Sequence, residues 1–264
     1  FFEPYKFYPA PIFAIPGNHD GDVDPTDITK PHSLDAFVKM FCASKTSVPP
    51  EAGDAVRSTI TQPNVYWTLV TPVANIIGLY TNAPEGGEIR GDQQQWFIKE
   101  LIKAESEKSS KALIVALHHP PYSMDSHHGA SRAMQQFLDD AFLKSKVYPD
   151  IIFTGHVHNY QRFTRKIGKR EIPYIVAGAG GYWFLHNINT GKKIIKAPCP
   201  SSFKDVIFEK YCEDRHGFLR ISIDMNIRKL KGEYFTVPRQ QESWKTPPVI
   251  FDSFTLDLVK NKVK

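Results

Sequence analysis

Two histidines near the middle of the chain are separated by one residue and follow a short apolar run. His156 and His158 belong to the segment GHVH at 155–158, directly after the run IIF at 151–153. Alternate side chains of an extended segment point to the same side, so both imidazoles can face one ligand. Imidazole is the commonest protein ligand of metal ions. The pair therefore predicts a metal site at the end of a strand.

Two more segments share this layout: GNHD at 17–20 follows the apolar run 12–15, and HHPPY at 118–122 follows the run 113–117. In an open α/β sheet, ligands bind outside the carboxyl ends of the strands. We therefore expect three strands to bring Asn18 and His118 to the same crevice as His156 and His158. Each segment alone could be a polar turn or a strand ended by proline. Their common layout favours one shared site.

The donor types of these segments limit which metal ions could bind. Neutral imidazole and amide oxygen suit Zn, Mn or Fe, and the absence of cysteine from the cluster argues against a closed structural zinc site. Two such metals about 3.5–4 Å apart can generate a hydroxide at neutral pH and hold both oxygens of an in-line displacement.

In the order GNHD, HHPPY, GHVHNYQR and AGAGGY (177–182), the chain resembles the calcineurin-like metallophosphoesterases, most closely the purple acid phosphatase branch. The resemblance covers nearly the whole chain. It implies one catalytic domain over residues 1–264, with a layered αββα fold of two sheets flanked by helices. It also implies a dinuclear centre of two divalent or mixed-valence transition metals, Fe, Zn or Mn, that hydrolyses phosphate esters.

The resemblance also assigns roles by motif position. Asn18, His118 and His156 would hold one metal, and His158 would hold the other. His19 would be an acid near the leaving group, with Asp20 orienting it. An imidazole beside a carboxylate is held in one tautomer and stays partly protonated near neutral pH, which suits donation to a departing alkoxide.

The chain contains two pairs of adjacent histidines, and the role of each pair is considered separately. In an extended segment only one of His118 and His119 can face the metals, and we choose His118. His119 is then either a hydrogen-bond donor behind the ligands or an ordinary core histidine. The second pair, His127 and His128, lies in a loop after HHPPY. By resemblance His128 contacts the substrate phosphate, and the alternative is a solvated loop histidine.

The chain departs from the family pattern before GNHD. Family members begin with a strand carrying Asp-x-His and continue with a strand carrying Gly-Asp, which supply the remaining ligands, including the carboxylate that bridges the metals. Neither motif precedes Gly17, and the similar triplet DSH at 125–127 comes too late in the order. We expect that an N-terminal portion with these strands is absent. By itself the chain should bind metal weakly or at one position.

Composition limits the class and the partners. The chain has 264 residues, 41% of them hydrophobic, and a formal net charge of +5. This length is sufficient for the core of one α/β domain. The positive charge would attract a phosphorylated small molecule or a nucleotide, but it is not gathered into the stripe that nucleic-acid binding requires. No apolar stretch reaches transmembrane length. The oligomeric state and the compartment stay open, although the resemblance favours a secreted or periplasmic protein.

The remaining elements are predicted from periodicity and local chemistry. Apolar residues from Met134 to Phe142 at helical spacing predict a helix capped by Ser131, and Asp92 is expected to cap another helix. The segments 217–224, 227–235 and 249–258 predict an antiparallel C-terminal sheet, 44–62 a surface loop, and the basic stretch 162–170 a hairpin or a substrate mouth. A single disulfide between Cys199 and Cys212 is compatible with the sequence.

Three functions follow from these observations. The first is an acid-phosphatase-like phosphomonoesterase, favoured by GHVHNYQR and by the loop of His127 and His128. The second is a phosphodiesterase or nucleotide hydrolase of the same superfamily, which shares every motif. The third is a catalytically silent metal-binding or interaction protein, favoured by the absent ligand motifs.

Overall fold

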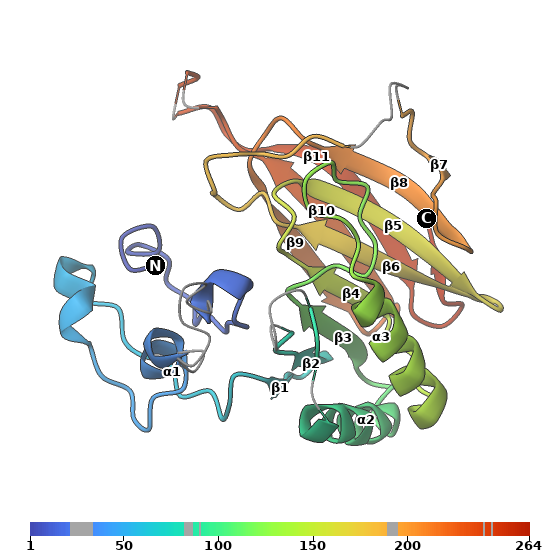
Figure 1. The fold of residues 1–264 in the computed structure, drawn as a ribbon, viewed down its shortest axis with the longest axis horizontal. Coiled ribbons are helices and arrows are strands. Elements are labelled where there is room, and N and C mark those ends of the chain that lie inside the picture. The colour runs from blue at the N-terminus through green and yellow to red at the C-terminus, as the bar shows by residue number, and fades with distance from the viewer. Residues whose placement is uncertain (22–33, 82–86, 90, 189–194, 240, 244) are drawn as a thin grey trace, which may run out of the picture.

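The computed structural model describes residues 1–21, 34–81, 87–89, 91–188, 195–239, 241–243 and 245–264. Two β-sheets lie next to each other, with helices against the larger one (Figure 1). The larger sheet has the order β1 (Trp67–Val70), β2 (Ala74–Gly78), β3 (Ala112–Leu117), β4 (Ile151–Thr154), β6 (Arg170–Ala177), β5 (Tyr160–Ile167), β8 (Val206–Cys212) and β7 (Cys199–Pro200). The smaller sheet has the order β12 (Lys262–Val263), β11 (Val249–Asp257), β10 (Lys229–Thr236) and β9 (Gly217–Asp224).

Parallel pairing in the larger sheet positions the histidine motifs. β3 pairs in parallel with β2 and with β4, and β4 pairs in parallel with β6. The HHPPY and GHVH segments therefore leave neighbouring strands at the same edge of the sheet. Five of the six residues of β3 are buried, as expected for a parallel strand covered on both faces.

Alternate residues of β3 and β4 contribute side chains to two different hydrophobic cores. Val115 and Ile152 face a cluster that includes Phe97 of α2 (Gly91–Glu105) and Leu138 of α3 (Arg132–Ser145). On the opposite face, Ile114 and Ile151 join the side chains of the smaller sheet, among them Tyr234, Phe254 and Leu256. The fold is thus a layered α/β sandwich of two sheets, as predicted. Both long helices of the described ranges lie against the larger sheet.

Several local predictions are confirmed. The Ser131 side chain accepts a hydrogen bond from the backbone N–H of Met134 and caps α3. β9, β10 and β11 form the predicted antiparallel sheet. Asp92 differs from the prediction because α2 already begins at Gly91, so Asp92 lies inside the first turn, where its carboxylate accepts from the N–H of Gln93.

The prediction of a strand before GNHD is wrong, because residues 12–15 form no strand in the structure. The backbone of Ala14 is instead bonded by side chains: Gln62 Oε1 accepts from its N–H at 2.7 Å, and Gln62 Nε2 and Trp67 Nε1 donate to its carbonyl at 3.0 and 2.7 Å. These side chains form the hydrogen bonds that a neighbouring strand would otherwise form with Ala14. Gln62 is consequently buried, at the end of a segment predicted as surface loop.

Short helices accompany this N-terminal region: η1 (Asn18–Asp20), α1 (Asp35–Phe41) and η2 (Pro50–Ala55). In α1, Phe37, Met40 and Phe41 form a small separate core, with Ile12 and Ala14 packed against it. The segment that carries Asn18 is therefore held by a core of its own. This small core fixes where the segment approaches the sheet edge.

Two further predictions are resolved by the C-terminal half. Cys199 and Cys212 are free thiols, so the disulfide left open by the sequence is not formed. The basic stretch does form the β5–β6 hairpin. Arg162 is nevertheless not a solvated hairpin residue, because its guanidinium forms a largely buried ion pair with Asp252 of β11, at 2.7 Å. None of the described helices is both long and apolar enough to span a membrane.

Candidate metal centre

The GHVH segment turns sharply after β4. Val157 is fully buried in the core, whereas His156 and His158 on either side of it remain partly exposed. His156 has a φ of 62°, in the left-handed region that a residue with a Cβ seldom adopts. Such backbone strain is held by surrounding structure and concentrates at functional sites. Here it directs both imidazoles away from the core.

Three of the predicted ligands meet at one point. Asn18 Oδ1 lies 2.8 Å from His118 Nε2, and His156 Nδ1 lies 3.2 Å from each of these two atoms. The three donors come from η1, from the end of β3 and from the turn after β4. The structure thus brings Asn18, His118 and His156 together across three separate segments.

Two glycines make this approach sterically feasible. A Cβ on Gly17 would lie 2.8 Å from the His118 ring, so the backbone of Gly17, next to Asn18, packs closely against that imidazole. A Cβ on Gly178 would lie 1.9 Å from the carbonyl oxygen of Val157. The GHVH turn and the glycine-rich turn after β6 are therefore in backbone contact, which explains the glycine at position 178.

Burial keeps the imidazoles of the centre uncharged. Desolvation, reinforced by the neighbouring histidines, lowers the pKa of His118 to about 3 and that of His156 to about 2. His119, which is also buried, has its pKa lowered to about 4 by the same cause. Neutral imidazoles keep a lone pair available, which is the form that binds metal ions.

His158 lines a pocket of about 370 Å³ together with Asn18, His118 and His156. Its ring packs 4.2 Å from the ring of Tyr182, and its Nδ1 is buried with no hydrogen-bond partner among the described residues. The fourth predicted ligand thus faces the same pocket as the other three. A buried nitrogen without a partner is unusual in proteins and is compatible with an additional ligand there.

His19 is exposed and lines the same pocket. Asp20, expected to orient it, accepts a hydrogen bond at 2.7 Å from the backbone N–H of Gly17. This bond holds the GNHD turn. The carboxylate therefore acts on the segment that carries Asn18 and His19.

His119 lies behind the three convergent donors. Its Nδ1 is 2.9 Å from the hydroxyl of Thr81, and its ring is 4.5 Å from that of His156. It is buried, and its Nε2 has no hydrogen-bond partner in the described ranges. Its position combines the two alternatives left open by the sequence, a core histidine and a hydrogen-bonded neighbour of the ligands.

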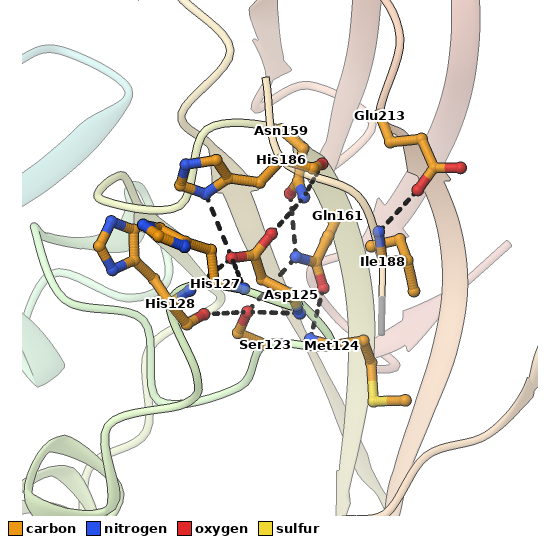
Figure 2. A network of polar contacts seen from close by, with 10 residues as sticks. All are labelled: Ser123, Met124, Asp125, His127, His128, Asn159, Gln161, His186, Ile188 and Glu213. Atoms are coloured by element: carbon orange, nitrogen blue, oxygen red, sulfur yellow. Dashed lines mark hydrogen bonds and ion pairs between the residues drawn. The ribbon is translucent and has the colours of Figure 1, made fainter. Parts of the chain in front are cut away.

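A second histidine cluster, missed from the sequence, surrounds Asp125 (Figure 2). The buried Asp125 carboxylate accepts from the backbone N–H groups of His127 and His128, and it lies 3.2 Å from Nδ1 of His186. Asn159 Nδ2 donates to its second oxygen at 3.0 Å. The triplet at 125–127 resembles Asp-x-His but follows HHPPY, which is too late for that motif, and nothing local in the sequence marks His186. Only the placement of His186 beside this loop reveals the cluster.

The two clusters are neighbours. The His128 ring lies 4.4 Å from the ring of His156 and 5.8 Å from that of His158. The residue predicted to contact substrate phosphate is thus adjacent to the predicted ligands. Partial burial, with the nearby histidines, lowers the pKa of His128.

Comparison with known proteins shows the family of the chain. The calcineurin-like phosphoesterase family matches residues 1–160. Purple acid phosphatase 21 of Arabidopsis thaliana is 30% identical over 128 residues, which cover 47% of this chain and 28% of that protein. Purple acid phosphatase 15 of the same plant is 30% identical over 209 residues, which cover 77% of this chain and 35% of that protein. The chain thus spans about a third or less of the length of these two relatives.

The fold has a counterpart among solved structures. A structure of PhoD superposes with a TM-score of 0.53 at 12% sequence identity, covering 77% of this chain and 44% of that one. At this identity the likeness concerns the fold alone. The sequence match is the stronger evidence, because it spans more than half of the 264 residues and contains the GNHD, HHPPY and GHVH motifs. The chain belongs to the calcineurin-like phosphoesterase family, as its resemblance to the purple acid phosphatases predicted.

Proposed function

We propose that this chain contributes to metal-dependent hydrolysis of phosphate esters, with phosphomonoesters as the preferred substrates. The observation that carries the proposal is the triangle of donor atoms from Asn18, His118 and His156, with sides of 2.8, 3.2 and 3.2 Å. Ligands bound to zinc at 2.0–2.1 Å are roughly 3.3 Å apart in a tetrahedral site and about 2.9 Å apart in an octahedral one. The triangle matches this spacing.

The residues fit a transition metal in chemistry as well as in spacing. Asn18 would supply an amide oxygen, and His118 and His156 would supply neutral imidazoles, a donor set suited to Zn, Mn or Fe. His158 would serve a second metal in the same pocket. When bound, such metals supply a hydroxide at neutral pH and stabilise charge on the phosphoryl oxygens.

Other side chains of the chain would act on the substrate. His19 is exposed at the pocket wall, where it can give a proton to the leaving oxygen. His128, beside His156, would donate to a phosphate oxygen. Both assignments follow the purple acid phosphatases, and the similarity to these proteins favours monoesters over diesters.

The pocket supports one metal better than two. Its lining contains no aspartate or glutamate among the described residues. Neutral ligands do not offset the repulsion between two cations about 4 Å apart in a medium of low dielectric constant. A dinuclear centre would therefore require carboxylates beyond this lining.

Metal loading with matched assays tests the proposal. The protein is loaded separately with Zn²⁺, Mn²⁺ or Fe³⁺, and its turnover is measured on an aryl phosphomonoester and on the corresponding diester. We expect a monoester preference. His156→Ala should lose metal from the Asn18 triangle and lose turnover, whereas His216→Ala should not, because His216 belongs to neither cluster. Preference for the diester would favour the phosphodiesterase alternative. Bound metal without turnover on either ester would favour a silent metal-binding protein.

A further inference from the structure

His127, His128 and His186 form a compact group of imidazoles beside the Asn18 triangle. Each offers one ring nitrogen, and these three atoms lie within 4.8 Å of one another. The ring centroids are 4.8 to 5.0 Å apart. Figure 2 shows the three rings on the same side of Asp125. None of the three belongs to the Asn18 triangle.

Asp125 fixes the tautomer of His186, which leaves one ring nitrogen able to bind a metal ion. His186 and Asp125 are both buried, and the carboxylate lies 3.2 Å from Nδ1 of the ring. Because an ionised carboxylate only accepts hydrogen bonds, the proton of a neutral His186 ring resides on Nδ1 and leaves the lone pair on Nε2. A carboxylate behind a histidine in this way is the usual support of a metal-binding imidazole.

The same carboxylate holds the loop that carries the other two imidazoles. Asp125 Oδ2 accepts from the backbone N–H groups of His127 at 2.9 Å and of His128 at 2.6 Å. Asn159 Nδ2 binds the second carboxylate oxygen and also the carbonyl oxygen of His186, both at 3.0 Å. One buried polar network thus fixes the His186 ring and the backbone that carries His127 and His128.

Access and donor type also suit a metal ion. His127 is exposed and His128 is partly exposed, so an ion can enter from solvent, while His186 forms the closed side. The rings of His127 and His128 form no hydrogen bond with any described residue. Three imidazoles with an open side are typical of sites for Zn²⁺ or a similar transition metal.

We propose that His127, His128 and His186 form a second transition-metal site, supported by Asp125 and separate from the Asn18 triangle. The inference does not depend on the proposed hydrolysis, because it concerns the binding of the metal alone. His128 has two ring nitrogens, so one could hold the cation while the N–H of the other donates to phosphate as proposed above. Asp125 is a positioning residue, since its carboxylate acts through His186 and through the loop.

This site is tested by titrating the metal-free chain with Co²⁺. Binding is measured by absorption and by mass spectrometry under native conditions. We expect the wild-type chain to bind two equivalents, and His127→Ala and His128→Ala to bind one each. His156→Ala should also retain one equivalent, and His127→Ala combined with His156→Ala should retain none. His127 is exposed, so its removal does not threaten the fold. His216→Ala is the control and should bind two.

Asp125→Asn tests the positioning role, because it keeps the shape of the side chain while removing its charge. We expect Co²⁺ affinity at this site to fall by about 10–100-fold, with binding at the Asn18 triangle unchanged. If His127→Ala and His128→Ala both bind Co²⁺ with wild-type number and affinity, the second site is overturned. A metal-loaded wild-type protein without turnover would contradict the proposed function, and it would leave the metal count unaffected.

Discussion

Asn18 Oδ1 lies 2.8 Å from His118 Nε2, although 100 residues separate them in the chain. Neither residue is held there by its own segment alone. The small core of α1 and the hydrogen bonds to Ala14 place the turn of Asn18, whereas the parallel pairing of β3 places His118. Changes at either end should therefore disturb the same metal site.

The division between ligand and acid can be tested by comparing two histidines. His156→Ala should remove metal from the Asn18 pocket, because it deletes one corner of the donor triangle. His19→Ala should leave bound metal nearly unchanged and lower turnover by about 10²–10⁴-fold, the contribution expected of a general acid. Metal content and kcat are measured on the same samples. Loss of metal from His19→Ala would show that it is a ligand.

Gly178→Ala should destabilise the protein by about 1–3 kcal/mol or more, because the new methyl group overlaps the carbonyl of Val157. The displaced GHVH turn should also weaken metal binding. The free energy of unfolding in urea and the metal affinity are the two measurements. Gly180→Ala is the matched control in the same turn, since a Cβ there contacts nothing within 4 Å. Equal effects of the two substitutions would contradict the prediction.

Asp252→Ala should lower the free energy of unfolding by about 3–5 kcal/mol, because it leaves the Arg162 guanidinium largely buried without its carboxylate. Tyr160 would lose its partner too, since its hydroxyl donates to Asp252 at 2.7 Å. These contacts connect β5 to β11 and so join the two sheets. Asp139→Ala, which breaks the more exposed pair with Arg165, should cost at most about 1 kcal/mol. Urea unfolding of both variants should therefore show clearly different midpoints.

Asp150→Asn should change how stability depends on pH. Burial raises the pKa of Asp150, although its carboxylate accepts from the N–H of Leu113 at 2.8 Å. A raised pKa in the folded state favours folding below about pH 4 and loses this contribution as the pH rises through the folded-state value. Asparagine keeps the acceptor for Leu113 and does not ionise. The free energy of unfolding of Asp150→Asn, relative to wild type, should thus increase from pH 4 to pH 7. A constant difference would show that Asp150 ionises without cost.

Much of the fold could be predicted because its signals are local. The alternation in residues 217–224 gave the bounds of β9, and helical spacing with a serine cap gave α3. The convergence of His118 and His156 was also accessible, since adjacent parallel strands end at the same edge of a sheet. In each case a short segment contains the pattern that determines its conformation.

The tertiary structure decided what no segment contains. Residues 12–15 have an apolar pattern typical of a strand, yet side chains of Gln62 and Trp67, not a neighbouring strand, bond the backbone of Ala14. Asp125 is 61 residues from His186, and their contact depends on how the turns after β3 and β6 meet. Sequence alone thus determined the donor types and the ends of β3 and β4, which present His118 and His156. Which distant partners satisfy each buried polar group was decided by packing, because burial forces such groups to pair with whatever the fold brings near.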